Sequence, residues 1–149
     1  MDAIDREILS LLQDDGRATM TQVAGKVGLS LSACHRRFRD LETSGVIQGF
    51  RAELDFEKLG KPFEALVFVT MEAGNHSAMT AFEEAAVQVP QIVQAQRLFG
   101  APDYQLYVAT ESKQTYQELY DSTLSQLPGV RRMTSTLIMK TVVAHRAPL

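Results

Sequence analysis

The sequence has little of what several large classes of protein require. Its single cysteine, Cys34, cannot form an internal disulfide or build a metal site with several cysteine ligands. No apolar run approaches the roughly 20 residues that a helix needs to cross a membrane. The first residues, MDAIDREIL, are acidic and amphipathic, unlike a secretory signal. We therefore expect a protein without a membrane segment that works in the reducing cytoplasm.

Features that support enzymatic chemistry are scarce as well. The sequence contains no glycine-rich phosphate-binding loop and no residue spacing typical of a metal site. No Ser-His-Asp arrangement can be argued from its histidines, which lie in a basic helix, at an expected exposed helix start and in the C-terminal tail: His35, His76 and His145. Cys34 is expected to be a small buried residue, with a redox-sensing thiol as the alternative. We predict no catalytic residue, no metal and no resident cofactor.

Positive charge is scarce overall and concentrated in one place. The chain carries 15 Lys and Arg against 18 Asp and Glu, so its formal net charge is −3. Neither the first sixty residues nor the remainder is basic. Three arginines and a histidine nevertheless fall within HRRFR, residues 35–39. This cluster, and not the total charge, points to a polyanionic partner.

The first sixty residues predict three capped helices. An apolar helical repeat follows each of three side chains that are suited to an N-cap: Asp2, Thr19 and Ser30. A glycine suited to end a helix follows each repeat: Gly16, Gly28 and Gly45. Gly25 lies inside the second helix, where close packing of its backbone against a neighbour would explain it. The tight turn between the second and third helices makes a helix-turn-helix.

The third helix separates apolar from cationic side chains. On a helical wheel, the side that we expect to face the core carries Leu31, Cys34, Phe38 and Leu41. The opposite side carries Ser32, Arg36, Arg39 and Thr43, and the flanks carry His35 and Arg37. The next segment, VIQGFRAEL (46–54), alternates in part and suggests a short hairpin, or wing. We interpret the third helix as a recognition helix for the major groove, with a solvated basic helix face as the alternative.

Three segments between residue 2 and about residue 60 carry a family resemblance: DxxDREIL, DDGR and VAGKVGLSxSACxRRxRDLExxGVIQGF. They resemble the N-terminal domain of the Lrp/AsnC family of transcription regulators. Two departures are Leu31, where the family usually has proline, and Phe50, where tyrosine is common. The resemblance implies a recognition helix over 30–43 and these DNA contacts, the first of them near a phosphate: Arg17, Ser30, Ser32, His35, Arg36 and Arg39. Arg37 matches a family arginine and joins this set, with an internal ion pair as the alternative.

Beyond a linker that Gly60 and Pro62 punctuate, the pattern changes to alternating strands and helices. Strands are predicted over 63–71, 91–100, 104–111 and 133–145, and helices over 76–89 and 113–127. This βαββαβ order is the ferredoxin-like arrangement, a four-stranded sheet with both helices on one face. The predicted fold class is α+β, with a winged helix-turn-helix domain over 1–60 and a ferredoxin-like ligand-sensing and oligomerisation domain over 61–149.

The uncovered face of this sheet predicts self-association. The segments ALVFV (65–69) and LIMKTVV (137–143) are apolar on both sides, and an open apolar face is an association surface. We therefore expect an obligate homodimer that pairs the sheets. A dimer also suits a helix-turn-helix, because paired recognition helices bind successive half-sites of double-stranded DNA. The family resemblance extends this expectation to octamers built from dimers.

The resemblance continues through the second half, where LFGAPDYQL matches the family's glycine and aspartate between the second and third strands. In the family, an amino-acid effector lies in a cleft where dimers meet. The matching positions are Leu98, Gly100, Ala101, Pro102, Asp103 and Tyr104, with Thr134 and Thr136 opposite. A carboxylate can bind an ammonium group, while glycine amides and threonine hydroxyls can bind a carboxylate. The alternative is a tight turn with a structural Asp103, and Pro102 removes one backbone donor.

Two other functions remain open at this point. Sirohaem decarboxylases resemble the family in fold and are enzymes, but their chemistry gives no reason to keep the basic HRRFR segment. A weakly specific architectural protein would bind most DNA sequences with a steep salt dependence. We interpret the chain as a sequence-specific transcription regulator in which an amino acid bound between dimers changes the affinity for DNA.

Overall fold

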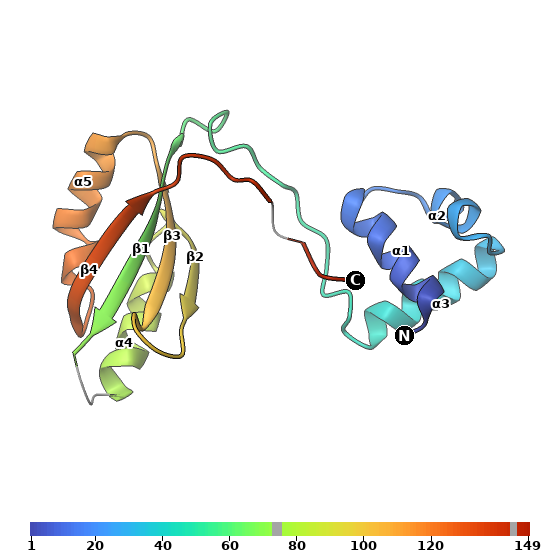
Figure 1. The fold of residues 1–149 in the computed structure, drawn as a ribbon, viewed down its shortest axis with the longest axis horizontal. Coiled ribbons are helices and arrows are strands. Elements are labelled where there is room, and N and C mark those ends of the chain that lie inside the picture. The colour runs from blue at the N-terminus through green and yellow to red at the C-terminus, as the bar shows by residue number, and fades with distance from the viewer. Residues whose placement is uncertain (73–75, 144–145) are drawn as a thin grey trace. The chain divides into compact units, whose positions relative to one another are not determined.

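Two compact units make up the computed structural model, which describes residues 1–72, 76–143 and 146–149 (Figure 1). The first unit contains Met1–Glu53 and Val143–Leu149, and the second contains Leu54–Val142. The linker after Glu53 therefore belongs to the second unit and the C-terminal tail to the first, whereas we predicted a single boundary at residue 60. His145 and the side chain of His76 lie outside the described residues.

Three helices form the first unit, and each begins at its predicted cap. The helices are α1 (Ala3–Asp14), α2 (Met20–Val27) and α3 (Leu31–Thr43). Asp2 and Thr19 each form a capping box, and Ser30 accepts the Ala33 N–H at 3.3 Å. Gly28 ends α2 in the left-handed conformation, with a φ of 68°. α2, the turn and α3 thus form the predicted helix-turn-helix.

One apolar core holds these helices together. Its buried side chains come from all three helices and are Ile8, Leu12, Val23, Ala24, Cys34 and Leu41. Leu31, which the helical wheel placed on the core side, is 46% exposed. A wheel gives a direction around the helix axis but not a position along it, and the buried positions of α3 begin only at Cys34. The explanation offered for Gly25 is also wrong, because a Cβ there would meet no atom within 4 Å.

The segment that follows α3 does not form the hairpin predicted over 46–54. All of residues 44–62 are described, and none of them is in a strand. Ile47 packs against the helical core, and the Phe50 ring stacks on Phe38 with their centroids 6.4 Å apart. Ile47 and Phe50 therefore pack against the helical unit, whereas Val46 and Leu54 stay exposed. A lone two-stranded hairpin is only marginally stable, and a glycine such as Gly49 weakens a strand further.

The second unit has the predicted ferredoxin-like fold. Its elements are β1 (Phe63–Met71), α4 (His76–Val87), β2 (Ile92–Arg97), β3 (Tyr104–Thr110), α5 (Lys113–Ser122), a 3₁₀ turn (Leu124–Gln126) and β4 (Val130–Leu137). The strands lie in the order β2-β3-β1-β4, and each neighbouring pair is antiparallel. Each βαβ half is split, because β3 inserts between β1 and β2 and β1 inserts between β3 and β4.

Both helices of the second unit cover the same face of the sheet. Alternate residues of β1 and β3, among them Val67 and Leu106, are buried in one core with Phe82 of α4 and Tyr116 of α5. The intervening strand residues point to the opposite face, because successive side chains of a strand alternate. We call this opposite side the open face, and its central residues are Leu66, Phe68 and Tyr107.

The last strand is shorter than predicted. β4 ends at Leu137, whereas the apolar pattern predicted a strand over 133–145. β4 lies at the edge of the sheet, and its last bond to β1 runs from the Ile138 N–H to the Glu64 carbonyl, at 3.0 Å. Beyond this point β1 offers no further partner, and Met139 is 98% exposed. The LIMKTVV segment is therefore not a strand that is apolar on both sides.

Candidate nucleic-acid interface and effector loop

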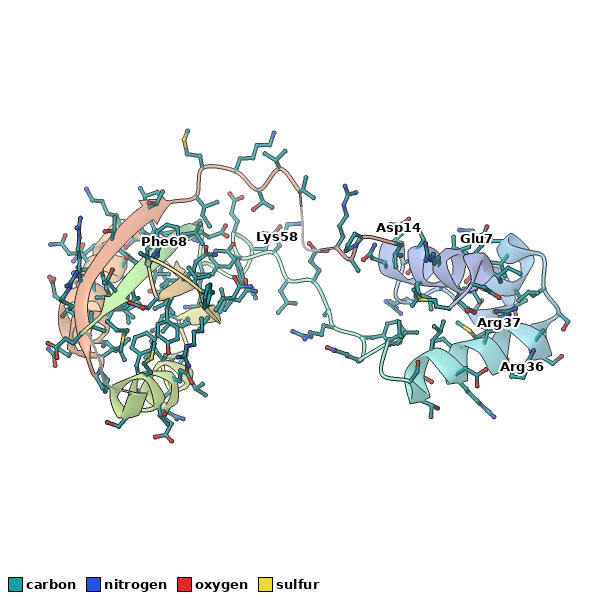
Figure 2. All side chains as sticks on the ribbon, turned by 60° about the horizontal axis from the view of Figure 1, so that its bottom comes forward. Glu7, Asp14, Arg36, Arg37, Lys58 and Phe68 are labelled. Carbon is teal, nitrogen blue, oxygen red and sulfur yellow. The ribbon has the colours of Figure 1, made fainter. Side chains whose placement is uncertain are left out.

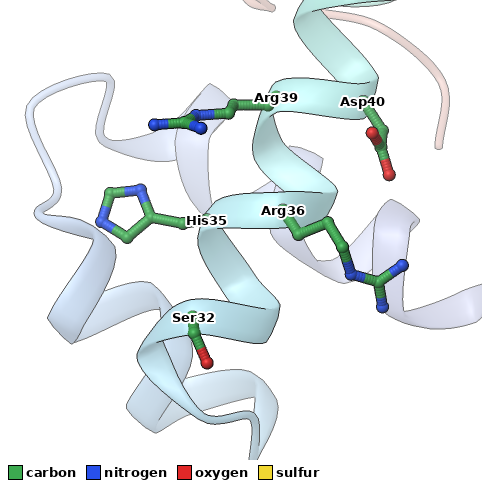
Figure 3. A pocket seen from close by; sticks show the side chains of 5 residues that line it. All are labelled: Ser32, His35, Arg36, Arg39 and Asp40. Atoms are coloured by element: carbon green, nitrogen blue, oxygen red, sulfur yellow. The ribbon is translucent and has the colours of Figure 1, made fainter.

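The exposed side of α3 brings together four of the residues that were predicted to contact DNA. One shallow hollow of about 390 Å³ is lined by these four residues and by Asp40: Ser32, His35, Arg36, Arg39 and Asp40 (Figure 3). All five side chains are exposed. The hollow follows from the sequence spacing, because positions i, i+3, i+4, i+7 and i+8 of a helix share one side.

Arg36 and Arg39 carry guanidinium groups that are open to a partner. In the part of the chain that the structure describes, neither takes part in an ion pair. Figure 3 shows Arg39 and His35 extending to one side of the helix and Arg36 to the other. Two guanidinium groups spread in this way can reach separate base edges or phosphates of a major groove that holds the helix.

Ser30 and Arg17 do not line this hollow. The Ser30 Oγ accepts the Ala33 N–H and lies 3.2 Å from the Ser32 Oγ, so it serves first as the cap of α3. Arg17 lies in the turn between α1 and α2, where its N–H donates to Asp15 at 2.9 Å and its side chain is exposed. Contacts of Ser30 and Arg17 with DNA stay predictions.

Arg37 has a structural partner instead of a free guanidinium. Its Nη1 donates to Asp5 Oδ1 at 2.7 Å and to Asp2 Oδ2 at 2.8 Å, and Figure 2 shows Arg37 between α3 and α1. The Asp5 N–H and then Arg37 lower the pKa of the Asp2 carboxyl, and the hydrogen bonds to Asp5 and Asp2 raise the pKa of Arg37. Arg37 therefore ties α3 to the start of α1, which is the internal ion pair weighed against a DNA contact, and its contact with DNA stays a prediction.

Asp40 is the member of the hollow that the sequence analysis missed. The sequence feature that could have identified Asp40 is its spacing of four residues from Arg36, which puts both side chains on one side of a helix. A carboxylate there repels phosphate but can accept the amino group of cytosine. The hollow thus combines cationic groups with one carboxylate.

The loop between β2 and β3 is held by hydrogen bonds at its base. The Leu98 N–H donates to the Asp103 carbonyl at 2.7 Å, and the Asp103 N–H donates to the Val69 carbonyl at 2.9 Å. One carboxylate oxygen of Asp103 accepts the Met71 N–H at 2.7 Å. Asp103 therefore has the structural role that was weighed against effector binding, and its second oxygen has no partner among the described residues. The peptide bond before Pro102 is cis, and Gly100 has a φ of 131°.

One chain does not bring the two parts of the predicted effector site together. Thr134 and Thr136 are exposed on β4 and belong to the open face, because they pair with residues of β1 on that face. β1 separates β4 from β3 and its loop. The Tyr104 side chain is buried on the helix side, where its O–H donates to Glu83 of α4 at 2.6 Å. Tyr104 could therefore serve an effector at the loop only through its main chain.

Neither a metal-binding cluster nor a membrane-spanning helix is present among the described residues. Residues 1–72, 76–143 and 146–149 contain no group of three His, Cys, Asp or Glu residues that could hold a metal ion. The helices within these same ranges are all too short or too polar to cross a membrane. Cys34 is fully buried, and its burial raises the pKa of the thiol.

Family models match both units of the chain. Residues 1–48 match a model described as a winged helix-turn-helix DNA-binding domain, and residues 64–148 match the Lrp/AsnC ligand binding domain. Among curated relatives, the Bkd operon transcriptional regulator of Pseudomonas aeruginosa is 38% identical over 148 residues, which are 99% of this chain and 97% of that protein. A leucine-responsive regulatory protein of Rhizobium meliloti is 33% identical over 95% of this chain and 91% of its own length.

Solved structures of transcriptional regulators also resemble this chain along nearly its whole length. A transcriptional regulator from Neisseria meningitidis in complex with L-Met superposes with a TM-score of 0.91 at 26% identity, over 97% of this chain and 93% of that one. An AsnC family regulator from Agrobacterium tumefaciens also gives a TM-score of 0.91, at 29% identity, over 99% of this chain and 97% of that one. With a helix-turn-helix unit, a ferredoxin-like unit and relatives that match along its whole length, the chain belongs to the Lrp/AsnC family of transcriptional regulators.

Proposed function

We propose that this chain regulates transcription by placing α3 in the major groove of its DNA sites. The observation that carries the proposal is the exposed side of α3, where Arg36 and Arg39 make no ion pair in the described chain. A guanidinium can donate two hydrogen bonds to one guanine, and Ser32 and His35 lie beside it within reach of base edges or phosphates. The names of its relatives, including that of the Bkd operon regulator, support a regulatory role.

The active form in this proposal is at least a homodimer that pairs open faces. Leu66 and Phe68 alternate along β1 with the buried Val67, and both remain partly exposed in a single chain. Tyr107 of β3 lies beside Leu66 on the same face. Pairing of two such faces would remove these side chains from water and would place two copies of α3 in one assembly. Octamers built from these dimers are a further step, and that step rests on the family resemblance.

An amino acid is the proposed effector, bound where dimers meet. Because β1 separates the 98–104 loop from Thr134 and Thr136, we infer that a site using both takes the loop from one chain and the strand from another. This arrangement would make effector binding depend on assembly, which is the linkage that the regulatory mechanism needs. The Neisseria relative solved with L-Met supports an amino acid as the chemical class.

Enzymatic activity is not part of the proposal, since the curated relatives are named as regulators. We place the protein in the cytoplasm, where its DNA sites would be. A sirohaem-decarboxylase-like enzyme and a weakly specific architectural protein are the two competing functions. The first requires porphyrin binding, and the second requires nearly uniform affinity for DNA sequences.

The first test is recovery of sheared genomic DNA with the purified protein at physiological salt, followed by sequencing. A small number of enriched sites with two-fold symmetry is the expected result. Uniform recovery would favour the architectural protein. No recovery, combined with a spectral shift on addition of a porphyrin, would favour the enzyme.

The effector loop is tested with Asp103→Asn, which keeps an oxygen that can accept the Met71 N–H while removing the charge. If the loop binds the ammonium group of an amino acid, this variant should lose the change in DNA affinity that the effector causes. Its affinity for DNA without effector should be unchanged. A response that survives in Asp103→Asn would show that the effector binds elsewhere.

A further inference from the structure

A second candidate binding site lies on the helix side of the sheet, between α4 and β2. The hollow there has a volume of about 550 Å³. Its walls come from α4, from β2 and from the first residue of β3: Phe82, Glu83, Ala86, Val87, Ile92, Val93, Gln94, Ala95, Arg97 and Tyr104. None of the loop residues 98–103 and neither Thr134 nor Thr136 lines it. The hollow shares only the side chain of Tyr104 with the effector site that the sequence predicted.

The hollow exists because β2 is the edge strand and α4 does not fully cover it. Phe82 and Ala86 of α4 turn into the core, which leaves Glu83 and Val87 at the rim of the helix. Ala95 of β2 faces the same side, because it pairs with the buried Leu106 of β3. α4 and β2 thus form two walls over an apolar floor, and the outer side is open to solvent.

One end of the hollow carries opposite charges. Glu83 Oε1 accepts the Tyr104 O–H at 2.6 Å and lies 3.7 Å from Arg97 Nη1. The other oxygen, Glu83 Oε2, has no hydrogen-bond partner within residues 1–72, 76–143 and 146–149. Burial and the bond to Glu83 raise the pKa of Tyr104 to about 12, so the phenol keeps its proton and holds Glu83 in place at neutral pH. The half-exposed pair of Glu83 and Arg97 is loose and of little energetic value by itself.

The other end is apolar. Val87 is 80% exposed and Val93 is 42% exposed, although both border the hollow. Val87 follows Glu83 by one helical turn, about 6 Å along the axis at 1.5 Å per residue. α4 and β2 run in opposite directions, so Val87 lies towards the start of β2 and Glu83 lies towards Arg97 at its end. On α4, the charged end and the apolar end are therefore about one helical turn apart.

We propose that this hollow binds a free α-amino acid with an aliphatic side chain. The ligand's ammonium group binds Glu83, its carboxylate binds Arg97, and its side chain lies along Val87 and Val93. Binding exchanges one loose ion pair for two charge-assisted hydrogen bonds and covers two exposed valines. The inference deepens the proposed amino-acid response, on which it rests, by giving it a second site and a side-chain preference. An acidic or basic side chain would leave a charge against the valines.

The test uses the full-length protein and isothermal titration calorimetry with L-leucine, L-valine and L-methionine. Each should bind, whereas L-aspartate and L-lysine should bind far more weakly. Two leucine analogues separate the contributions of the charged groups: 4-methylpentanoate lacks the ammonium group, and 3-methylbutylamine lacks the carboxylate. Each analogue should lose about tenfold in affinity or more, because it gives up one charge-assisted hydrogen bond.

Two variants locate the ligand. Arg97→Gln and Val87→Asp change exposed side chains, so the fold should persist, and each should weaken L-leucine binding by about tenfold or more. Arg131→Gln is the matched control for the lost charge, since Arg131 is an exposed arginine outside the hollow, and it should bind L-leucine like the parent.

Three outcomes would overturn the inference. One is L-leucine binding that survives Arg97→Gln and Val87→Asp but is lost in Asp103→Asn, which would place the ligand at the loop. Another is equal binding of the acidic and aliphatic amino acids. The third is no binding of any tested amino acid. Enrichment of specific genomic sites by the same preparations would show in each case that the DNA-binding function holds while this site fails.

Discussion

Arg36 and Arg37 are neighbours in the sequence, yet their surroundings differ completely. Arg37 is held by Asp2 and Asp5, so its charge is used inside the first unit. Arg36 lines the exposed hollow and makes no ion pair within the described chain. One step along a helix turns a side chain by about 100°, which is enough to separate the structural role of Arg37 from the DNA-binding role that we propose for Arg36.

The two arginines should therefore respond differently to the same substitution. Arg36→Ala should weaken binding to a specific DNA site, reduce the salt dependence of binding by about one ion, and leave the melting temperature unchanged. Arg37→Ala should lower the melting temperature, because it leaves two carboxylates without their partner. Filter binding at several salt concentrations and thermal unfolding measure the two effects. Loss of DNA affinity in Arg37→Ala without any loss of stability would contradict this assignment.

Asp2 makes part of the stability of the first unit depend on pH. Its pKa in the folded protein lies below the unfolded value of about 3.9, so its stabilising effect is present above that pH and is lost as the pH falls through the folded pKa. Asp2→Asn should therefore be less stable than the parent at pH 7, and the difference should shrink in acid. Urea unfolding at pH 7 and at pH 3 measures this.

Glu7→Gln serves as the matched control for Asp2→Asn, since Glu7 is exposed on the same helix and makes no ion pair in the described residues. The control should show the same stability difference from the parent at both pH values. A pH-independent difference for Asp2→Asn would mean that the N-cap geometry, and not its charge, is what stabilises α1.

At the scale of elements, local chemistry decides where helices begin and end. α1, α2 and α3 each start one residue after an oxygen-bearing side chain that caps the helix. Such signals lie within four residues of the helix end and do not depend on the rest of the fold. Gly25 and Gly28 show how the same residue type can be replaceable at one position and required three residues later.

The two glycines of α2 give a matched pair of predictions. Gly25→Ala should raise the free energy of unfolding by about 0.5–1 kcal/mol, because the helix interior favours alanine and the added methyl group meets no atom. Gly28→Ala should lower it by about 1–2 kcal/mol, because Gly28 has a φ of 68°. Chemical denaturation of both variants checks the signs. Destabilisation by Gly25→Ala would show that α2 is packed more closely than the structure indicates.

At the scale of the whole molecule, the proposed homodimer depends on the open face. Its centre is apolar at Leu66 and Phe68, and Phe68 is labelled in Figure 2. The surrounding positions on β4 are polar, among them Thr134 and Thr136. An apolar centre with a polar rim is the usual composition of a protein interface. We therefore expect this face to control both oligomer size and affinity for two-fold symmetric DNA sites.

Phe68→Asp tests the role of the open face. A charge at the centre of the paired faces should shift the protein towards a monomer and weaken binding to symmetric sites, because the two contacts are no longer tethered. Sedimentation analysis and DNA binding measure the two effects, with Gln117→Asp on the exposed side of α5 as the control. A dimer that persists in Phe68→Asp would show that the interface lies elsewhere.

The sequence by itself determined the three capped helices, the helix-turn-helix and the order of elements in the second unit. These features depend on caps, glycines and apolar periodicity, which act over a few residues. Only the tertiary structure decided that Arg37 binds Asp2 and Asp5, that Phe50 stacks on Phe38 in place of a wing hairpin, and that β4 ends where its partner β1 begins. Each of these depends on contacts between residues distant in the sequence, whose positions no local pattern specifies. The hollow between α4 and β2 is of the same kind, because it exists only where a helix and an edge strand meet.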